Sequence, residues 1–198
     1  MSELRNALVY FLAAAVFQNL VLTTGIGSAL TLRLTRNPSN RKVFFLALLG
    51  FSLVTVVSFY PIDRVLGLGE LGKLFRPVVL VALCAVWYLV AALLLKKLLP
   101  RVYQDIRSML PYAAVNTVVT GVGLIANHQF QSSLLVCMAL AVGATVGFIL
   151  VFLVLAEGID RMQHEEMPKA FAGLPAQFLY LGILALALCG FATDISFI

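Results

Sequence analysis

The chain alternates between long apolar runs and short segments that hold its charged residues. Four runs contain no charged residue: the 27 residues between Arg5 and Arg33, the 20 between Lys42 and Asp63, the 19 between Arg76 and Lys96, and the 24 between Lys169 and Asp194. A helix rises about 1.5 Å per residue, so each run is long enough to cross a hydrocarbon core about 30 Å thick. We therefore expect one membrane-spanning helix in each of these runs.

A fifth uncharged run is too long for a single span. It covers the 49 residues between Arg107 and Glu157, and as one helix it would be about 74 Å long. The polar segment Asn127–Ser133 predicts a loop that divides it into two helices. Continuous Leu, Val and Ala runs do not alternate as barrel strands do. The prediction is an all-α integral membrane protein, one membrane domain over residues 1–198 with six transmembrane helices.

Composition supports this class of protein. Apolar residues make up 62% of the chain and charged residues 12%, with a mean hydropathy of +1.01; soluble domains carry about 25% charged residues. The net charge is +5, but the basic residues lie at the ends of apolar runs, where topology signals belong. We expect contact with membrane lipid and no binding of nucleic acid.

The basic residues also predict an orientation. If the amino terminus is outside, the outer segments hold Arg5, Arg64, Lys73 and Arg76, with Asp63–Arg76 taken as an outer loop. The inner loops then hold the other ten, namely Arg33, Arg36, Arg41, Lys42, Lys96, Lys97, Arg101, Arg107, Arg161 and Lys169. Basic residues favour the cytoplasmic side. We expect both termini outside, in a bacterial cytoplasmic (inner) membrane.

Two segments of the chain resemble each other. Asn19–Gly27 in the first span is similar to Asn116–Gly123 in the fourth, with one residue of slippage. Each segment is followed by two more spans, and three helices per repeat place the second copy upside down in the membrane. The predicted architecture is an inverted repeat of three plus three helices, with repeat 1 over about 1–99 and repeat 2 over about 100–198.

Glycine pairs in both segments predict interruptions of the first and fourth helices, because glycine weakens a helix and admits a neighbouring backbone. Such paired interruptions mark the central site of inverted-repeat membrane proteins. Simple close packing of helices is the alternative, and both interpretations stay open. The candidate interface between the repeats consists of Asn19, Thr23, Thr24, Gly25, Gly27, Asn116, Thr117, Thr120, Gly121 and Gly123.

Catalytic and metal-binding chemistry is sparse. No charged residue falls inside the core of a predicted span, which disfavours a transporter that relies on membrane carboxylates. His164 lies near Asp160 and Glu165, but an exposed loop of mixed charge is expected there. We predict no catalytic residue and no metal site.

Three segments carry a family resemblance: Leu110–Asn116, Ala141–Phe148 and Met167–Gly173. Through them the chain resembles the six-helix membrane subunits of the Rnf electron-transport complex and of the sodium-translocating NADH:quinone oxidoreductase. The resemblance implies interrupted first and fourth helices and a dimer, homomeric or heteromeric, with a related subunit of opposite topology. It also implies other Rnf/Nqr-type subunits as partners, and electron transfer coupled to sodium or proton transport.

Cysteine usage departs from that family. The resemblance implies a cysteine just past each interruption, together holding an iron–sulfur cluster, but these positions are Thr117 and Ala29, or Ser28 if the alignment slips. None can replace a thiolate ligand. We therefore expect no cluster and no other cofactor. Cys84, Cys137 and Cys189 are interpreted as apolar thiols between helices, and the sequence assigns them no redox role.

Three functions are compatible with the sequence. The leading one is a membrane subunit of an Rnf/Nqr-like complex, at most an electron-relay subunit and without a cluster of its own. The alternative is a stand-alone transporter of a small solute or ion that binds at the two broken helices. The third is a structural assembly subunit.

Overall fold

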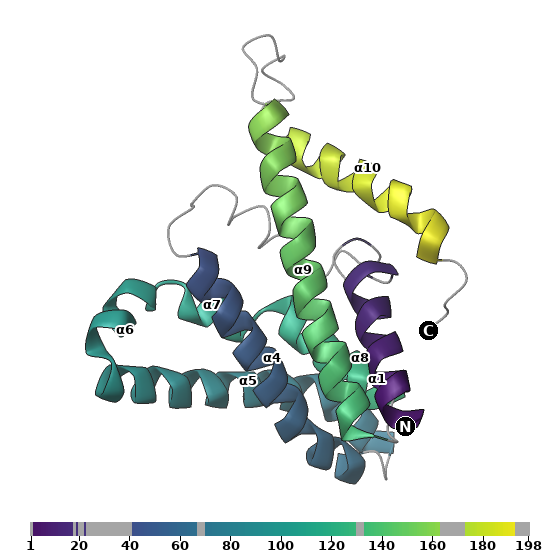
Figure 1. Cartoon of the computed structure of the whole chain (residues 1–198). Coiled ribbons are helices and arrows are strands. Elements are labelled where there is room, and N and C mark those ends of the chain that lie inside the picture. Colours follow the sequence, from purple (N-terminus) through teal and green to yellow (C-terminus); the bar gives the residue numbers. More distant parts are fainter. Residues whose placement is uncertain are drawn as a thin grey trace.

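The computed structural model describes residues 2–17, 19, 22, 41–66, 70–129, 133–162 and 173–192, and all regular structure within them is helical. This confirms the all-α class. The elements are α1 (Ser2–Leu12), the π-helix η1 (Ala13–Phe17), α4 (Arg41–Leu66), α5 (Glu70–Leu98), α6 (Pro100–Ile106), α7 (Leu110–Ala114), α8 (Thr117–Gln129), α9 (Leu134–Met162) and α10 (Leu174–Ala192) (Figure 1).

Three helices in the described part of the chain are long and apolar enough to cross a membrane. They are Lys42–Leu66 in α4, Leu74–Leu98 in α5 and Leu134–Gly158 in α9. Two shorter apolar stretches, Leu110–Ala126 and Pro175–Ala187, follow the same composition. The length and apolar composition of these helices agree with the integral membrane protein that the sequence predicts.

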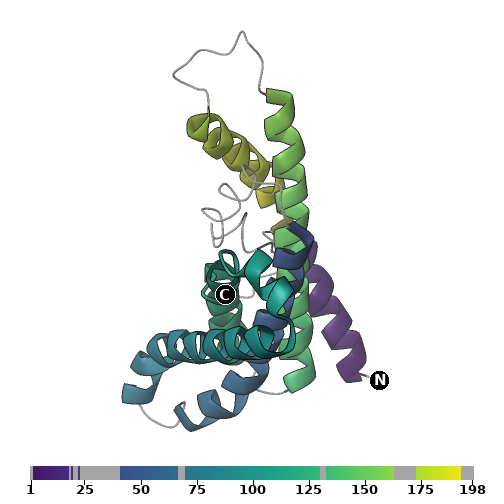
Figure 2. The same ribbon diagram turned by 90° about the vertical axis from the view of Figure 1, so that its left-hand side faces the viewer.

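Helix α9 lies at the centre of the packing. Helices α1, α4, α8 and α10 all contact it, and α1 runs alongside it in two views (Figures 1 and 2). The largest fully buried side chains lie on α4, α5, α8 and α9, among them Phe59, Leu80, Phe148 and Phe152. The core is therefore built around the contacts of α9 with α4 and α8.

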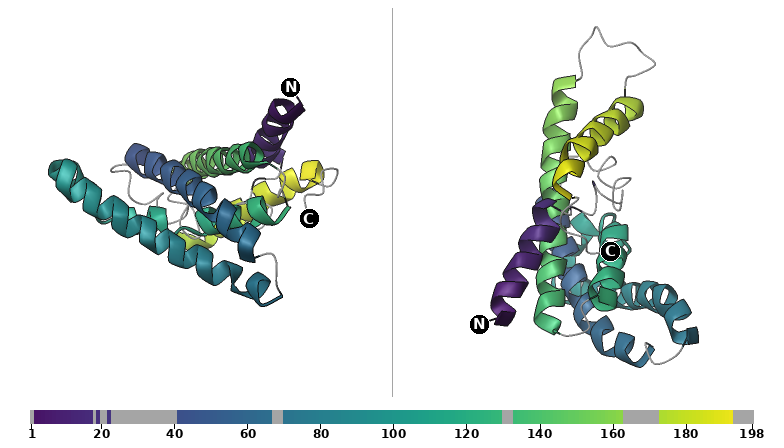
Figure 3. Two further views of the ribbon diagram at one scale, coloured as in Figure 1. Left: turned by 90° about the horizontal axis from the view of Figure 1, so that it is seen from below. Right: turned by 90° about the vertical axis from the view of Figure 1, so that its right-hand side faces the viewer.

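Helix α5 lies at the edge. In the apolar, membrane-length part of α5, 11% of the residues are buried inside the structure, whereas the corresponding share in α9 is 56%. Seen from below, α5 runs along one side of the molecule, with α4 between it and α9 (Figure 3). Apolar side chains on such a helix need lipid or a neighbouring protein around them.

One predicted helix boundary is confirmed. Helix α8 ends at Gln129 and α9 begins at Leu134, so the long apolar run is divided within the polar segment Asn127–Ser133. The helix extends further into that segment than the sequence predicted.

The predicted loop Asp63–Arg76 is shorter than the sequence indicates. Helix α4 continues to Leu66 and α5 begins at Glu70, so the helices include both Asp63 and Arg76. Arg76 Nε lies 2.7 Å from Asp63 Oδ1, and this pairing allows both charges to be buried. Opposite charges on neighbouring helices can neutralise each other, which a single run of sequence does not reveal.

Candidate functional site

The first interruption follows α1 and includes η1 and Asn19. Helix α1 changes into the π-helix η1, a widened turn often found at functional sites, and the buried Asn19 then lies outside any helix. Asn19 Nδ2 donates a hydrogen bond of 2.7 Å to the carbonyl of Gly147 on α9, and lies 3.4 Å from the Ala15 carbonyl. The amide of Asn19 thus attaches the interruption to α9.

Two glycines of α9 form the surface on which this interruption packs. A Cβ atom on Gly143 would lie 2.5 Å from the Phe11 carbonyl oxygen, and one on Gly147 would lie 2.9 Å from that of Ala15. No real Cβ atom tolerates such a contact without movement of the backbone. The Gly143-x-x-x-Gly147 spacing, typical of close helix packing, was the available signal, and it was not used in the sequence prediction.

The second interruption separates α7 from α8. Helix α7 ends at Ala114, Val115 leaves the helical region with φ −101° and ψ 45°, and α8 begins at Thr117. The buried Asn116 lies between them, and its Oδ1 accepts a hydrogen bond of 3.1 Å from the Val118 N–H. Asparagine is a favoured residue for this N-terminal cap.

Two threonines complete this second interruption. Thr117 Oγ1 donates to Asn116 Oδ1 at 3.4 Å, and Thr120 Oγ1 donates to the Asn116 carbonyl at 3.3 Å. Asn116 Nδ2 is buried and has no hydrogen-bond partner among the described residues. The structure therefore brings Asn116, Thr117 and Thr120 together and leaves one buried donor available.

The glycine pair predicted this interruption at the wrong residues, whereas the family resemblance implied a break just before Thr117. Gly121 and Gly123 lie inside α8, and the helix is broken at Val115 and Asn116 instead. The helix breaks at Asn116 because the asparagine side chain can cap the start of α8. Gly123 can stay helical because it packs closely against α5, where a Cβ atom on Gly123 would lie 2.5 Å from Leu80 Cδ1. The remaining predicted site residues, Thr23, Thr24, Gly25, Gly27, Ser28 and Ala29, lie outside the described residues.

A buried polar pair at the crossing of α4 and α9 escaped the sequence prediction. Ser52 Oγ and Thr145 Oγ1 lie 3.0 Å apart, and both residues are fully buried. Each hydroxyl also contacts a carbonyl of its own helix, that of Leu49 or Ala141, at 2.9 Å. Serine and threonine commonly bond to their own helix in this way, so their sequence positions gave no signal.

Two cysteines, Cys84 and Cys137, have hydrogen-bonding contacts with residues other than Thr117. Cys84 on α5 is buried 3.9 Å from Thr55 Oγ1, and Cys137 on α9 donates to the Ala126 carbonyl at 3.4 Å. Cys189 belongs to α10. Among the described residues, no group of three or more His, Cys, Asp or Glu side chains is placed to hold a metal ion.

Comparison with known proteins gives one family match over nearly the whole chain. Residues 7–195 match the family described as Rnf-Nqr subunit, membrane protein. The chain is 28% identical over 191 residues to a subunit of the Na(+)-translocating ferredoxin:NAD(+) oxidoreductase complex of Acetobacterium woodii, covering 93% of this chain and 96% of that protein.

Two further relatives extend the comparison. Identity is 24% over 189 residues to a subunit of the Proton-translocating ferredoxin:NAD(+) oxidoreductase complex of Clostridium ljungdahlii, covering 96% of this chain and 97% of that protein. It is 35% over 98 residues to a subunit of the Ion-translocating oxidoreductase complex of Rhodobacter capsulatus, covering 50% of each chain.

Proposed function

Because this chain belongs to the Rnf-Nqr family of membrane subunits, as its match over residues 7–195 establishes, we propose that it is a membrane subunit of an Rnf-like electron-transport, ion-translocating complex. The observation that carries this proposal is the likeness, over nearly full length, to two proteins named as subunits of such complexes. Those two relatives are named for sodium and for proton translocation respectively, so the proposal specifies the complex and leaves the ion open.

An inverted repeat of six transmembrane helices is the proposed architecture. Asn19 and Asn116 lie 97 residues apart, and the same offset carries η1 onto α7 and α4 onto residues 138–163, which largely coincide with α9. It carries α5 onto residues 167–195, which include α10. Helices α4 and α9 run in opposite directions (Figures 1 and 2), as an inverted repeat requires.

The chain is proposed to hold no iron–sulfur cluster of its own. Thr117, at the position where the family resemblance implies a cysteine, has a hydroxyl that donates to Asn116, and a neutral hydroxyl does not bind iron as a thiolate does. The buried thiol of Cys84 lies beside the Thr55 hydroxyl, and that of Cys137 donates a hydrogen bond to the Ala126 carbonyl. These donor groups do not fit a cluster ligand set, so no electron-transfer step through this chain is proposed.

A related six-helix subunit of opposite topology, identical or different, is the proposed partner at the second interruption. Tyr112, Val115 and Thr117 are exposed there. Non-helical backbone at membrane depth is stable only where protein or water satisfies its polar groups. We therefore expect another subunit to contact the exposed surface at the second interruption.

Both termini are proposed to lie outside the cytoplasmic membrane. The ion pair with Asp63 neutralises Arg76, which reduces the basic residues that argue against this orientation to Arg5, Arg64 and Lys73. Labelling of a single cysteine at Ser2 or Ile198 with an impermeant reagent in intact cells is the test. Protection of either site would reject the orientation.

A stand-alone transporter is the second candidate function. The unpartnered Asn116 Nδ2, buried beside a broken helix, is the observation that favours it, since a solute with an acceptor group would satisfy that donor. In this case the protein would act without electron-transfer subunits.

Anaerobic purification from its own host in mild detergent distinguishes these functions. A subunit of an Rnf-like complex should co-purify with flavin and iron–sulfur subunits, whereas a stand-alone transporter should be isolated alone. Iron, sulfide, visible absorption and EPR measurements on the separately expressed chain test the cluster. A stoichiometric cluster on the separately expressed chain would contradict that part of the proposal, and replacement of all three cysteines by serine would then show whether they or other residues ligate it.

A further inference from the structure

The 97-residue repeat offset relates two asparagines whose side-chain amides differ in their contacts. Asn19 Nδ2 donates to the Gly147 carbonyl on α9, whereas the buried Asn116 Nδ2 has no hydrogen-bond partner among the described residues. A buried donor without a partner costs free energy. Asn116 would therefore be more stable in an arrangement that brings a carbonyl to its amide.

The same offset identifies a matching carbonyl. It relates Gly147 to Gly50 on α4, which is also a glycine. A Cβ atom on Gly147 would lie 2.8 Å from Asn19 Nδ2, whereas one on Gly50 would have no atom within 4 Å, and Gly50 is exposed. A helix carbonyl has a second lone pair for such a side-chain donor. The second repeat thus contains both halves of the contact between Asn19 and Gly147, but they do not meet.

Helix α7 packs on α4 one step away from Gly50. The offset relates η1 to residues 110–114, which form α7. Carbonyls of η1 lie against Gly147, but α7 lies beside Ala47, three residues before Gly50. Residues three apart are neighbours on a helix surface. A shift of α7 by one such position would reproduce on α4 the packing that η1 makes on α9.

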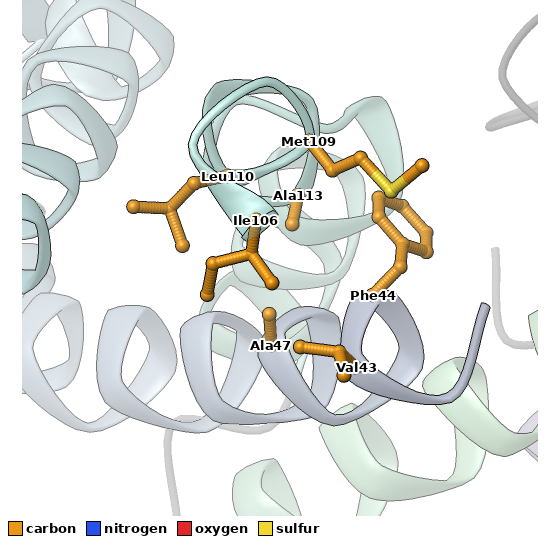
Figure 4. Close-up of a pocket in the computed structure, with 7 residues that line it drawn as sticks. All are labelled: Val43, Phe44, Ala47, Ile106, Met109, Leu110 and Ala113. Carbon is orange, nitrogen blue, oxygen red and sulfur yellow. The ribbon is translucent and has the colours of Figure 1, made fainter. Parts of the chain in front are cut away.

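The observed contact between α7 and α4 is incompletely filled. Figure 4 shows Ala47 on α4 and Ala113 on α7 on opposite sides of a space with an apolar lining, and Phe44 and Met109 lie together at one end. The volume of this space is about 10 Å³, enough for about one water molecule. The side chains around such a space lose van der Waals contacts. Leaving this packing therefore costs α7 less free energy than leaving a filled one.

We propose that α7 and Asn116 alternate between two positions on α4: the observed one beside Ala47, and a docked one in which α7 lies over Gly50 and Asn116 Nδ2 donates to the Gly50 carbonyl. Asn116 Oδ1 remains the cap of α8 in both positions. Leu46 occupies the position equivalent to Gly143, so the close approach is confined to Gly50. Two discrete packings of one element make a conformational switch. The inference rests on the inverted repeat proposed above and not on membership of an Rnf-like complex.

Cysteine cross-linking in the purified full chain, with all three native cysteines replaced by serine, tests the proposal. The Ala15 carbonyl would lie 2.9 Å from a Cβ atom on Gly147, and Ala15 corresponds to Tyr112. Gly50→Cys with Tyr112→Cys, the docked pair, therefore reports the docked position. Ala47→Cys with Ala113→Cys, the observed pair, reports the observed one. On oxidation with copper phenanthroline in mild detergent, both pairs should form a disulfide within one chain, as identified by the mass of the cross-linked protein.

The hydrogen bond to Gly50 has its own control. Asn116→Ser retains an acceptor that can cap α8 but lacks the amide donor. It should lower cross-linking of the docked pair about fivefold, as the loss of one hydrogen bond predicts, and leave the observed pair unchanged. Gly182→Cys on α10 with Tyr112→Cys measures background collisions.

Three results would overturn the proposal: cross-linking of the docked pair at the background rate, an equal effect of Asn116→Ser on both pairs, or disulfides only between two chains. None of them bears on co-purification with flavin and iron–sulfur subunits, which tests membership of the complex separately.

Discussion

Asp63 on α4 and Arg76 on α5 form an ion pair, with Arg76 Nε 2.7 Å from Asp63 Oδ1 and their side chains 9% and 4% exposed for Arg76 and Asp63 respectively. The pair joins the ends of two apolar helices that three residues of sequence connect. Removing one partner leaves the other as an uncompensated buried charge, which is strongly destabilising. Either residue without its partner would therefore destabilise the α4–α5 hairpin.

We expect Asp63→Asn to lower the free energy of unfolding by about 3–5 kcal/mol, because Arg76 remains buried and charged. Replacing both residues with apolar side chains of similar volume, as in Asp63→Leu with Arg76→Met, should restore much of that loss. Unfolding of the purified chain in mixed micelles, followed by circular dichroism, measures the effect.

An exposed ion pair provides the matched control. Arg161 and Glu157 lie 2.8 Å apart with side chains 79% and 66% exposed, and such pairs contribute about 0–1 kcal/mol. Glu157→Gln should therefore change stability little. A similar loss for Asp63→Asn and Glu157→Gln would show that the buried pair has no special role.

The glycines of α9 give a second prediction. Gly147→Ala and Gly143→Ala each introduce a Cβ atom against a carbonyl of η1 or α1, so we expect a loss of about 1–3 kcal/mol, as in other overpacked sites. Gly50→Ala in α4 and Gly182→Ala in α10 have no atom within 4 Å of the new Cβ. Those two should be neutral or slightly stabilising, since alanine favours a helix over glycine.

Folded yield and melting temperature of the four alanine variants decide this prediction. All four glycines lie in helices, so intrinsic helix propensity favours each substitution equally. Only local packing distinguishes the two pairs. A ranking in which Gly50 or Gly182 is the least replaceable would contradict the close contact between α9 and the first interruption.

Much of the helical content followed from the lengths of apolar runs, whereas the positions of the interruptions did not. The division of the long run between α8 and α9 required polar residues that are visible in the sequence. The interruption at Asn116 depends on a side chain that caps α8, and many asparagines in membrane helices do not cap anything. Gly123 looked like a break because glycine weakens helices, but its contact with Leu80 provides a packing reason for it.

Tertiary pairing explains the other differences from the sequence prediction. Charged residues such as Asp63 and Arg76 are typical of loops unless their ion pair is known. Ser52 contacts Thr145, which lies 93 residues later in the chain. Each depends on which helices become neighbours. Apolar periodicity carries little of that information in a chain whose helices are apolar on most faces.

The cap at the second interruption gives a third prediction. Asn116→Ala removes the acceptor for the Val118 N–H, so we expect a loss of about 1 kcal/mol in stability. Asn116→Ser can still cap α8 and should lose less. Hydrogen exchange at the first residues of α8, measured by mass spectrometry, reports this local effect; equal protection in all three proteins would exclude a capping role.

A cysteine at position 117 tests the proposed partner surface. In a variant with Cys84, Cys137 and Cys189 replaced by serine, Thr117→Cys places a single thiol at the exposed first residue of α8. We expect this thiol to react with a maleimide in the isolated chain and to be protected in a purified complex. The same thiol at Val118, which is fully buried, should be protected in both. Reaction of the Thr117→Cys thiol at equal rates in the isolated chain and in the complex would show that no other protein covers this face, and would move the proposed interface elsewhere on the molecule.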